Sequence, residues 1–259
     1  MKRFCILEYP SKNNLSTIFY NRYFRALHLN LLYDSLSCHP DIFGSYINHV
    51  LKTYSGINVT NPFKERVLEY IELNETARDI GSVNCIFEKI GYNTDYVGFL
   101  KSVDLKFLEE PVLVIGYGGV AKTILYSLLK IGLKDIFVMN RTKKRLIGLE
   151  KKFPKIKTID FLELNSSLKR FKTLINATSL GLNNESFDID NLSSLSYIYD
   201  VIYYETPLQN MAKIEGIPFT SGIKMWYYQA IENLKLWDLY NELLFNEIFH
   251  KFVEEWRNK

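Results

Sequence analysis

A glycine-rich loop, set between an apolar strand and an apolar helix, restricts the fold of this 259-residue chain more than any other feature. The run Val112–Ile115 is apolar throughout, as is typical of a strand buried on both faces of a parallel sheet. The loop Gly116–Ala121 follows it and leads into the helix. In this arrangement the glycines allow a tight turn, and backbone N–H groups at the helix start face an anionic pyrophosphate. The pattern predicts a dinucleotide site, against the alternative of a tight turn that binds nothing.

A second strand, expected at Asp135–Met139, ends beside residues that select the nucleotide. An NAD site would place Asp or Glu at this point, to accept a hydrogen bond from the ribose 2′-hydroxyl. Here Asn140, Arg141 and Thr142 follow the strand. A guanidinium and a hydroxyl suit a 2′-phosphate, so the sequence favours NADP. The alternative is that Arg141 is only a surface residue at a helix start.

Strand and helix patterns alternate along the rest of the chain, which is typical of α/β proteins. Before residue 102, we expect strands at Phe4–Tyr9, Leu32–Leu36, Gly56–Thr60, Val83–Phe87 and Gly91–Asn93. After Pro111 we expect a run of βα units, whose further strands lie at Lys157–Ile159, Thr173–Asn176 and Tyr197–Ile202.

The pattern therefore predicts a two-lobed α/β protein. Its N-terminal α/β domain covers residues 1–102 and is completed by residues 223–259, and a doubly wound Rossmann domain covers residues 103–222. The tail from Lys224 is expected to be helical and to pack back on the first lobe. Among the helix starts, Ser16 is expected to cap the first helix, and His39 and the two residues after it to open a second. A polar helix is expected from Lys143.

Composition narrows the class of protein further. The chain is 47% hydrophobic and 24% charged, as in ordinary globular proteins, and its net charge of +3 is spread along the sequence rather than clustered as in a nucleic-acid binder. Three cysteines lie far apart, which fits a reducing compartment and predicts neither a metal site nor a disulfide framework. No apolar run has the length of a membrane helix or a signal peptide, so a cytoplasmic protein is expected.

Polar residues gather at predicted strand ends of the first lobe. Asn58 and Thr60 alternate on one face of a strand, and Asn84 is expected at the same level. Lys64, beyond the strand end, can donate to a carbonyl or hydroxyl group and act as an acid–base group if it is buried. Asp95 opens a helix, where capping the helix is an alternative role. We interpret Lys64 and Asp95 as a candidate proton-transfer pair.

Several multi-residue motifs, in the same order, resemble the signature blocks of the shikimate dehydrogenase family. They are Gly56–Lys64, Gly81–Asn84, Asn93–Gly98, Gly116–Gly119, Asn140–Thr142, Asn176–Gly181, Tyr203–Leu208 and Gly222–Met225 with Gln229. The resemblance covers essentially the whole chain. It implies an NADP-dependent reversible reduction of 3-dehydroshikimate to shikimate, a step of aromatic amino-acid biosynthesis, in a cleft between the two lobes.

The resemblance also assigns roles to individual residues. It implies that Lys64 and Asp95 are the catalytic pair. The candidate substrate-binding residues are Asn14, Ser16, Asn58, Thr60, Asn84, Asp95, Tyr203 and Gln229. The candidate cofactor-binding residues are Glu75, Gly116, Tyr117, Gly118, Gly119, Val120, Asn140, Arg141, Thr142, Lys144, Thr178, Ser179, Val201, Gly222 and Met225.

The first loop departs from the family pattern, which usually has a glycine, a proline and then Ser-x-Ser-Pro. This chain keeps Pro10 and Ser16, but Glu8 replaces the glycine, Asn14 the first serine and Thr17 the second proline. A carboxylate at Glu8 would repel an anionic substrate, whereas the Asn14 amide can still donate to a carboxylate.

These changes leave two alternatives to shikimate reduction. One is a relative that acts on quinate or an amino-substituted shikimate, and the other is an NADP-binding sensor with impaired catalysis. In each case we expect a small-molecule ligand, NADP(H) as the cofactor, no metal, and neither nucleic acid nor a membrane as a partner. A homodimer is one option for the assembly.

Overall fold

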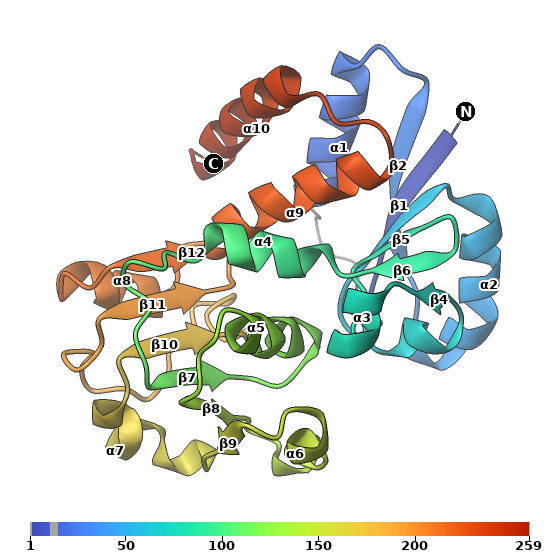
Figure 1. Ribbon diagram of the computed structural model, residues 1–259. Helices are drawn as coiled ribbons and strands as arrows, with labels where there is room; N and C mark the ends of the chain where they lie inside the picture. The colour runs from blue at the N-terminus through green and yellow to red at the C-terminus, as the bar shows by residue number, and fades with distance from the viewer. Residues whose placement is uncertain (1, 11–14, 259) are drawn as a thin grey trace. The chain divides into compact units, whose positions relative to one another are not determined.

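The computed structural model describes residues 2–10 and 15–258, which divide into two units (Figure 1). The first unit comprises Met1–Thr94 and Ala230–Lys259, and the second comprises Asp95–Gln229. The division falls inside two helices, α4 (Thr94–Ser102) and α9 (Gly222–Leu236). The domain boundaries expected at residues 102 and 223 stay a prediction.

The first unit is built on a six-stranded mixed sheet in the order β2-β1-β3-β5-β6-β4. The strands are β1 (Lys2–Glu8), β2 (Leu31–Ser37), β3 (Gly56–Val59), β4 (Glu72–Leu73), β5 (Cys85–Phe87) and β6 (Ile90–Tyr92). The helices of this unit's first segment are α1 (Leu15–Ala26), α2 (Phe43–Thr53) and α3 (Glu75–Ile80). The strands β2, β1 and β3 run parallel, so their carboxyl ends meet at one edge of the sheet.

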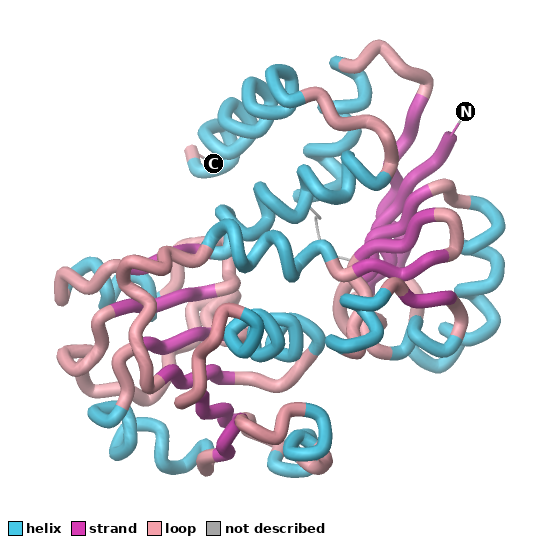
Figure 2. Tube along the Cα trace, in the orientation of Figure 1, coloured by secondary structure: helices cyan, strands magenta, loops and turns pink. Residues whose placement is uncertain are grey.

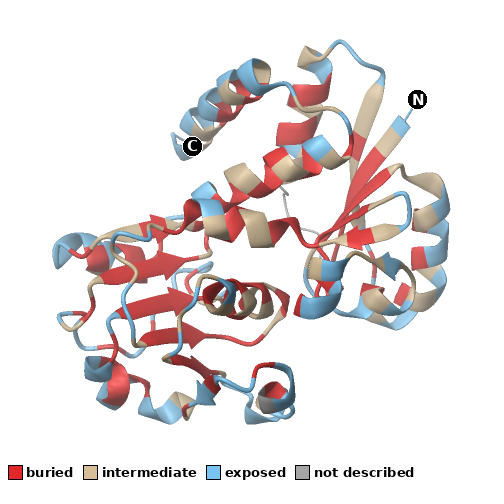
Figure 3. Cartoon of the chain, viewed as in Figure 1, coloured by how far each residue is buried: buried red, intermediate tan, exposed pale blue. Residues whose placement is uncertain are grey.

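The two faces of this sheet differ in chemistry because side chains alternate along each strand. On one face Phe4 of β1 contacts the rings of Phe24 and Trp237, with centroid distances of 5.3 and 4.9 Å. On the other face Cys5 and Leu7 of β1 join a hydrophobic core with Phe43, Ile47 and Val50 of α2. Figure 3 shows the resulting burial along the central strands.

The helix α10 (Glu242–Arg257) belongs to the first unit and packs on α1. The ring of Phe19 in α1 lies 5.5 Å from Phe245, 5.5 Å from Phe249 and 5.7 Å from Phe252, which form one stripe of α10. The expectation that the helical tail packs back on the first lobe is confirmed.

The hydroxyl of Tyr23 in α1 makes two hydrogen bonds to the turn between α9 and α10. It donates to the carbonyl of Leu239 at 2.9 Å and accepts from the amide of Asn241 at 2.8 Å. We expect Tyr23→Phe to lower the free energy of unfolding by about 1–3 kcal/mol, since two backbone groups lose their partner. Urea denaturation measures this, with Tyr9→Phe, at a half-exposed ring of the same unit, as the control. Equal stability of the two variants would contradict the role of this hydroxyl.

The second unit carries a six-stranded parallel sheet in the order β12-β11-β10-β7-β8-β9. The strands are β7 (Val112–Ile115), β8 (Ile136–Met139), β9 (Ile156–Thr158), β10 (Thr173–Asn176), β11 (Tyr197–Asp200) and β12 (Phe219–Ser221). Its remaining α-helices are α5 (Gly119–Lys130), α6 (Leu149–Lys152), α7 (Leu164–Ser167) and α8 (Pro207–Ile214). Counted within the unit, this is the 3-2-1-4-5-6 order of the Rossmann fold, read from the opposite edge. The predicted fold class is confirmed.

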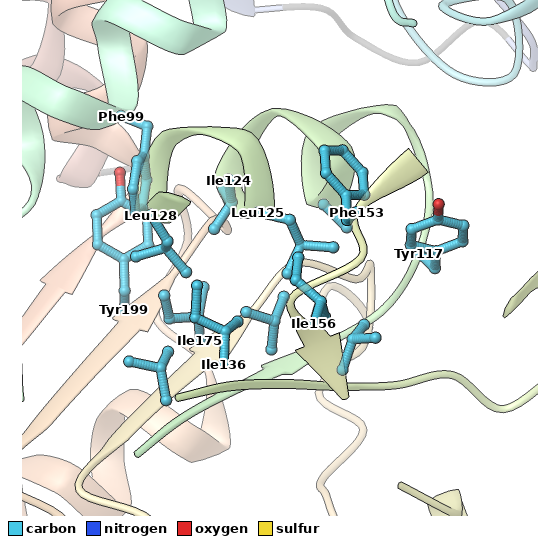
Figure 4. Packing of buried hydrophobic residues seen from close by; sticks show 14 of the residues in the cluster. Phe99, Tyr117, Ile124, Leu125, Leu128, Ile136, Phe153, Ile156, Ile175 and Tyr199 are labelled. Carbon is cyan, nitrogen blue, oxygen red and sulfur yellow. The ribbon is translucent and has the colours of Figure 1, made fainter. Parts of the chain in front are cut away.

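Helices cover both faces of this sheet, as Figure 2 shows. On one face Ile124, Leu125 and Leu128 of α5 pack over Ile136 and Ile175 of the strands (Figure 4). A separate apolar cluster covers the other face and includes Leu113, Leu174 and Leu208. The central strands β7 and β8 are therefore buried on both sides, which explains their unbroken apolar runs.

Two expectations about helices are wrong. Ser16 does not cap α1, because the helix begins at Leu15 and Ser16 lies within its first turn. The polar helix expected from Lys143 is a short 3-10 turn, Lys143–Leu146, followed by the single turn of α6. Gly148, with a φ of +84°, separates the two because this left-handed conformation ends a helix. Within residues 2–10 and 15–258, no helix is long and apolar enough to cross a membrane.

Candidate active site

The glycine loop lies at the carboxyl end of β7, where the strand order of the second sheet reverses. Gly116 has a φ of +107°, and a Cβ there would lie 3.0 Å from the carbonyl oxygen of Ala177. Gly118 caps α5 without a side-chain hydrogen bond, and a Cβ at Gly118 would meet no atom within 4 Å. The loop thus leaves open space directly before the first N–H groups of a long helix. This geometry fits a pyrophosphate.

The end of β8 carries exposed polar and basic residues. Asn140 donates through its side-chain amide to the carbonyl of Thr142 at 2.8 Å, which shapes the turn. Arg141, Thr142 and Lys144 are exposed, and within the described part of the chain no carboxylate pairs with Arg141. The neighbouring Lys143 differs, because it pairs with Asp160 at 2.5 Å. Arg141 and Lys144 therefore offer positive charge to an anionic ligand.

The loop after β10 lies beside the glycine loop. The amide of Ala177 donates to the carbonyl of Ile115 at 2.9 Å. Thr178 donates to the side-chain oxygen of Asn176 through its amide at 3.0 Å and its hydroxyl at 2.7 Å. Thr178 and Ser179 are consequently held at the same edge of the sheet as Gly116.

The first turn of α9 lies against the loop after β11. The amide of Gly222 donates to the carbonyl of Ile202 at 3.0 Å. A Cβ at Gly222 would lie only 2.0 Å from the carbonyl oxygen of Val201, so this position accepts glycine alone. Next to it, the ring of Tyr203 stacks on Trp226 with centroids 5.8 Å apart. The structure thus groups Val201, Tyr203 and Gly222.

The helices α4 and α9 approach closely within the second unit. A Cβ at Gly98 would lie 2.8 Å from the carbonyl oxygen of Met225 and 3.1 Å from the Cβ of Gln229. Asp95 precedes Gly98 by three residues and so occupies the same side of α4. Partial burial raises the pKa of Tyr203, and the negative charge of Asp95 raises it further. These contacts bring Asp95, Tyr203 and Gln229 into one neighbourhood. As the second residue of α4, Asp95 is not its cap.

The first unit holds a chain of buried amides beside its central strands. Tyr33 donates to the side-chain oxygen of Asn58 at 2.7 Å, and the amide of Asn58 donates to the carbonyl of Asn84 at 3.2 Å. The side chain of Asn84 donates to the hydroxyl of Thr94 at 2.9 Å and accepts from its backbone amide at 2.7 Å. Asn58, Asn84 and Thr94, the residue before Asp95, are thus joined in one hydrogen-bond network.

Lys64 lies in the turn that follows β3 and is only 7% exposed. Its carbonyl accepts from the amide of Val83, the residue before Asn84, at 2.9 Å. The preceding Phe63 stacks on Phe43 with centroids 4.5 Å apart, which anchors the turn in the core. The amide of Phe63 also donates to the carbonyl of Thr60 at 2.9 Å. A buried lysine can act as an acid–base group in proton transfer.

Glu8 closes β1 and is buried at 6% exposure. The hydroxyl of Ser35 donates to its Oε1 at 2.8 Å, so the carboxylate has a hydrogen-bond donor in the neighbouring strand.

Glu75 is the exposed first residue of α3 and lies in the first unit, unlike the other candidate cofactor-binding residues. Asn14 lies outside the described residues.

Sequence reasoning missed a buried carboxylate, Asp200, at the end of β11. It is fully buried and accepts hydrogen bonds from Asn176, Thr206 and Gln209. The one signal in the sequence is a charged residue directly after the apolar run Tyr197–Tyr199.

The fold and these sites define a class: two-domain proteins in which a Rossmann domain is joined to an α/β domain with a buried lysine. Comparison with known families agrees. The model of the "Shikimate dehydrogenase substrate binding domain" matches residues 6–86, and that of "Shikimate / quinate 5-dehydrogenase" matches residues 100–189. The chain belongs to the shikimate dehydrogenase family, as its motifs predict.

Individual relatives match over nearly the full length. The NADP(+) shikimate dehydrogenase of Thermotoga maritima is 42% identical over 97% of this chain and all of its own. A crystal structure of shikimate dehydrogenase from that organism superimposes with a TM-score of 0.92, covering 97% of this chain and 99% of the other. The structure of the Aquifex aeolicus enzyme is 31% identical, with a TM-score of 0.86 and coverage of 98% and 97%.

Proposed function

We propose that this chain catalyses the NADP-dependent, reversible reduction of 3-dehydroshikimate to shikimate. The observation that carries the proposal is the buried Lys64, held beside the amide network of Asn58 and Asn84 in a member of this family. The name of the Thermotoga maritima relative, an NADP(+) shikimate dehydrogenase, supports it.

The residues of the second unit suit NADP(H). Gly116–Val120 would bind the pyrophosphate, while Asn140, Arg141, Thr142 and Lys144 would hold the adenosine with its 2′-phosphate. The loops after β10 and β11 and the start of α9 would line the rest of the cofactor. When bound, the cofactor supplies or accepts the hydride.

The remaining candidates position the substrate and its proton. Lys64 would donate a proton to the reacting oxygen during reduction and recover it in the reverse direction, with Asp95 as its partner. The candidate residues for binding the substrate's hydroxyls and carboxylate are Asn14, Ser16, Asn58, Thr60, Asn84, Tyr203 and Gln229. Each of these assignments is a proposal that substitution tests.

Arg141 would set the preference for NADP over NAD. We expect Arg141→Ala to raise KM for NADPH about 10- to 100-fold and to leave KM for NADH nearly unchanged, because a charge-assisted phosphate contact is lost. Steady-state kinetics with both cofactors measures the ratio. Arg170→Ala, in the same unit, is the control. An equal loss with both cofactors would show that Arg141 does not read the 2′-phosphate.

The direct test of the function is absorbance at the NADPH band when purified protein, NADP and shikimate are mixed. We expect a rise with shikimate and NADP, and a weaker one with NAD. Quinate in place of shikimate tests the alternative substrate that the altered loop sequence from Glu8 to Thr17 suggests. Absence of any signal, despite measurable NADP binding, would favour a sensor without catalysis.

Two further expectations stay predictions. Within the described residues Cys5, Cys38 and Cys85 form no disulfide bond, which supports a reducing, cytoplasmic location. A homodimer is tested by light scattering of the purified chain.

A further inference from the structure

The buried carboxylate of Asp200 has no role in the proton transfer proposed above, yet each of its two oxygens accepts two hydrogen bonds. One oxygen, Oδ1, accepts from the side-chain amide of Asn176 at 2.9 Å and from the backbone amide of Ile202 at 3.1 Å. The other, Oδ2, accepts from the hydroxyl of Thr206 at 2.7 Å and from the side-chain amide of Gln209 at 3.0 Å. Four donors thus converge on one carboxylate.

Through these donors Asp200 joins two loops that are distant in sequence. The Asn176 side chain that donates to Asp200 also accepts from Thr178, so it shapes the loop after β10. The Thr206 hydroxyl caps α8 by accepting from the amide of Gln209 at 3.1 Å, and so ends the loop after β11. The Gln209 side chain donates to the carbonyl of Tyr204, inside that loop, at 3.1 Å.

Both loops lie at the carboxyl edge of the parallel sheet, where doubly wound folds bind their ligands. The loop after β10 contacts the glycine loop through Ala177 and Gly116. The loop after β11 carries Val201 and Tyr203, next to Gly222. A displacement of the carboxylate would therefore move cofactor-facing backbone on both sides.

Only an ionised carboxylate satisfies this arrangement. An asparagine at position 200 would offer one acceptor oxygen, and its NH₂ group would face two further donors. Burial raises the pKa of Asp200, and the four donors oppose that rise by stabilising the charged form.

We propose that Asp200 is a positioning residue, which holds the loops after β10 and β11 in the geometry that binds the cofactor. This inference rests on the proposed function, since it assumes that these loops line an NADP(H) site. It differs from a purely structural role because it predicts a loss of binding beyond the loss of stability.

The test compares Asp200→Asn with Tyr197→Phe. Tyr197 lies at the opposite end of the same strand, where its hydroxyl donates to Thr220 at 2.7 Å and accepts from the amide of Asp104 at 3.1 Å. Both variants lose buried hydrogen bonds in the same unit, but only Asp200 is at the ligand edge. NADPH binding is measured by the fluorescence of the bound nucleotide, with Tm and steady-state kinetics beside it.

We expect Asp200→Asn to raise the Kd for NADPH about tenfold and to lower kcat/KM about 10- to 100-fold, because misplaced binding groups lose both affinity and alignment. We expect Tyr197→Phe to lower Tm while its Kd for NADPH stays within about twofold of wild type. Equal Kd values in the two variants would overturn the proposal and leave Asp200 with a structural role only.

A second pair covers the case in which Asp200→Asn does not fold. Thr206→Val removes one donor to Asp200 at nearly constant volume, and Thr206→Ser keeps it. We expect the Kd for NADPH to rise in the valine variant and to stay near the wild-type value in the serine variant. Loss of binding in neither variant would also overturn the proposal. If the wild-type chain binds NADPH but does not oxidise shikimate, the proposed function fails while the binding comparison still decides the role of Asp200.

Discussion

Lys64→Ala is expected to lower kcat with shikimate about 10²- to 10⁴-fold, while the Kd for NADPH stays at its wild-type value. The reason is that one acid–base group is lost from the first unit, whereas the glycine loop and Arg141 lie in the second. Stopped-flow absorbance at the NADPH band measures the chemical step, and fluorescence titration measures cofactor binding.

Lys52→Ala is the matched control for this variant. Lys52 is an exposed lysine of the same unit, near the end of α2, and its removal is expected to leave kcat unchanged. Wild-type turnover in Lys64→Ala would remove Lys64 from the mechanism. A loss of NADPH affinity equal to the loss of kcat would point instead to a disturbed fold.

Gly222→Ala is expected to lower the free energy of unfolding by about 3 kcal/mol or more. A Cβ there would lie 2.0 Å from the carbonyl oxygen of Val201 and 2.4 Å from its carbonyl carbon. These are backbone atoms of a short loop, which cannot rotate away as a side chain would. Urea denaturation of the purified variant measures the loss.

Gly118→Ala is the complementary control. Because a Cβ at Gly118 meets no atom within 4 Å, this variant is expected to unfold like the wild type. The added methyl group would project beside the proposed pyrophosphate site, so NADPH affinity should fall. Full stability in Gly222→Ala would show that the first turn of α9 can move away from Val201.

Much of the fold follows from local pattern. The strand β7 begins and ends where the apolar run Val112–Ile115 predicts, because strands buried on both faces tolerate few polar residues. The strand β10 also has the predicted bounds, Thr173–Asn176. Predictions of helix boundaries fail where the conformation of a single residue ends the helix. Gly148, in the left-handed conformation, interrupts the helix predicted from Lys143, and the hydrophobic periodicity of the sequence does not predict this interruption.

The site is predictable only in part, for a different reason. Motifs such as the glycine loop act within a few residues, so the sequence predicts them. The Asp200 network joins Asn176, Thr206 and Gln209, which come together because β10 and β11 are neighbours in the sheet. That adjacency depends on strand order, which local pattern does not encode. The pairing of Lys64 with Asp95 stays a prediction, since the two residues belong to different units.

The discontinuity of the first unit has a consequence for biosynthesis. The ring of Phe19 is covered by Phe245, Phe249 and Phe252, which the ribosome adds only after residues 95–229 are complete. During translation the second unit is therefore the first to have its whole sequence available. Until α10 is synthesised, the aromatic face of α1 that carries Phe19 has no packing partner in α10. Exposed hydrophobic surface of this kind makes a nascent chain prone to aggregation and to chaperone binding.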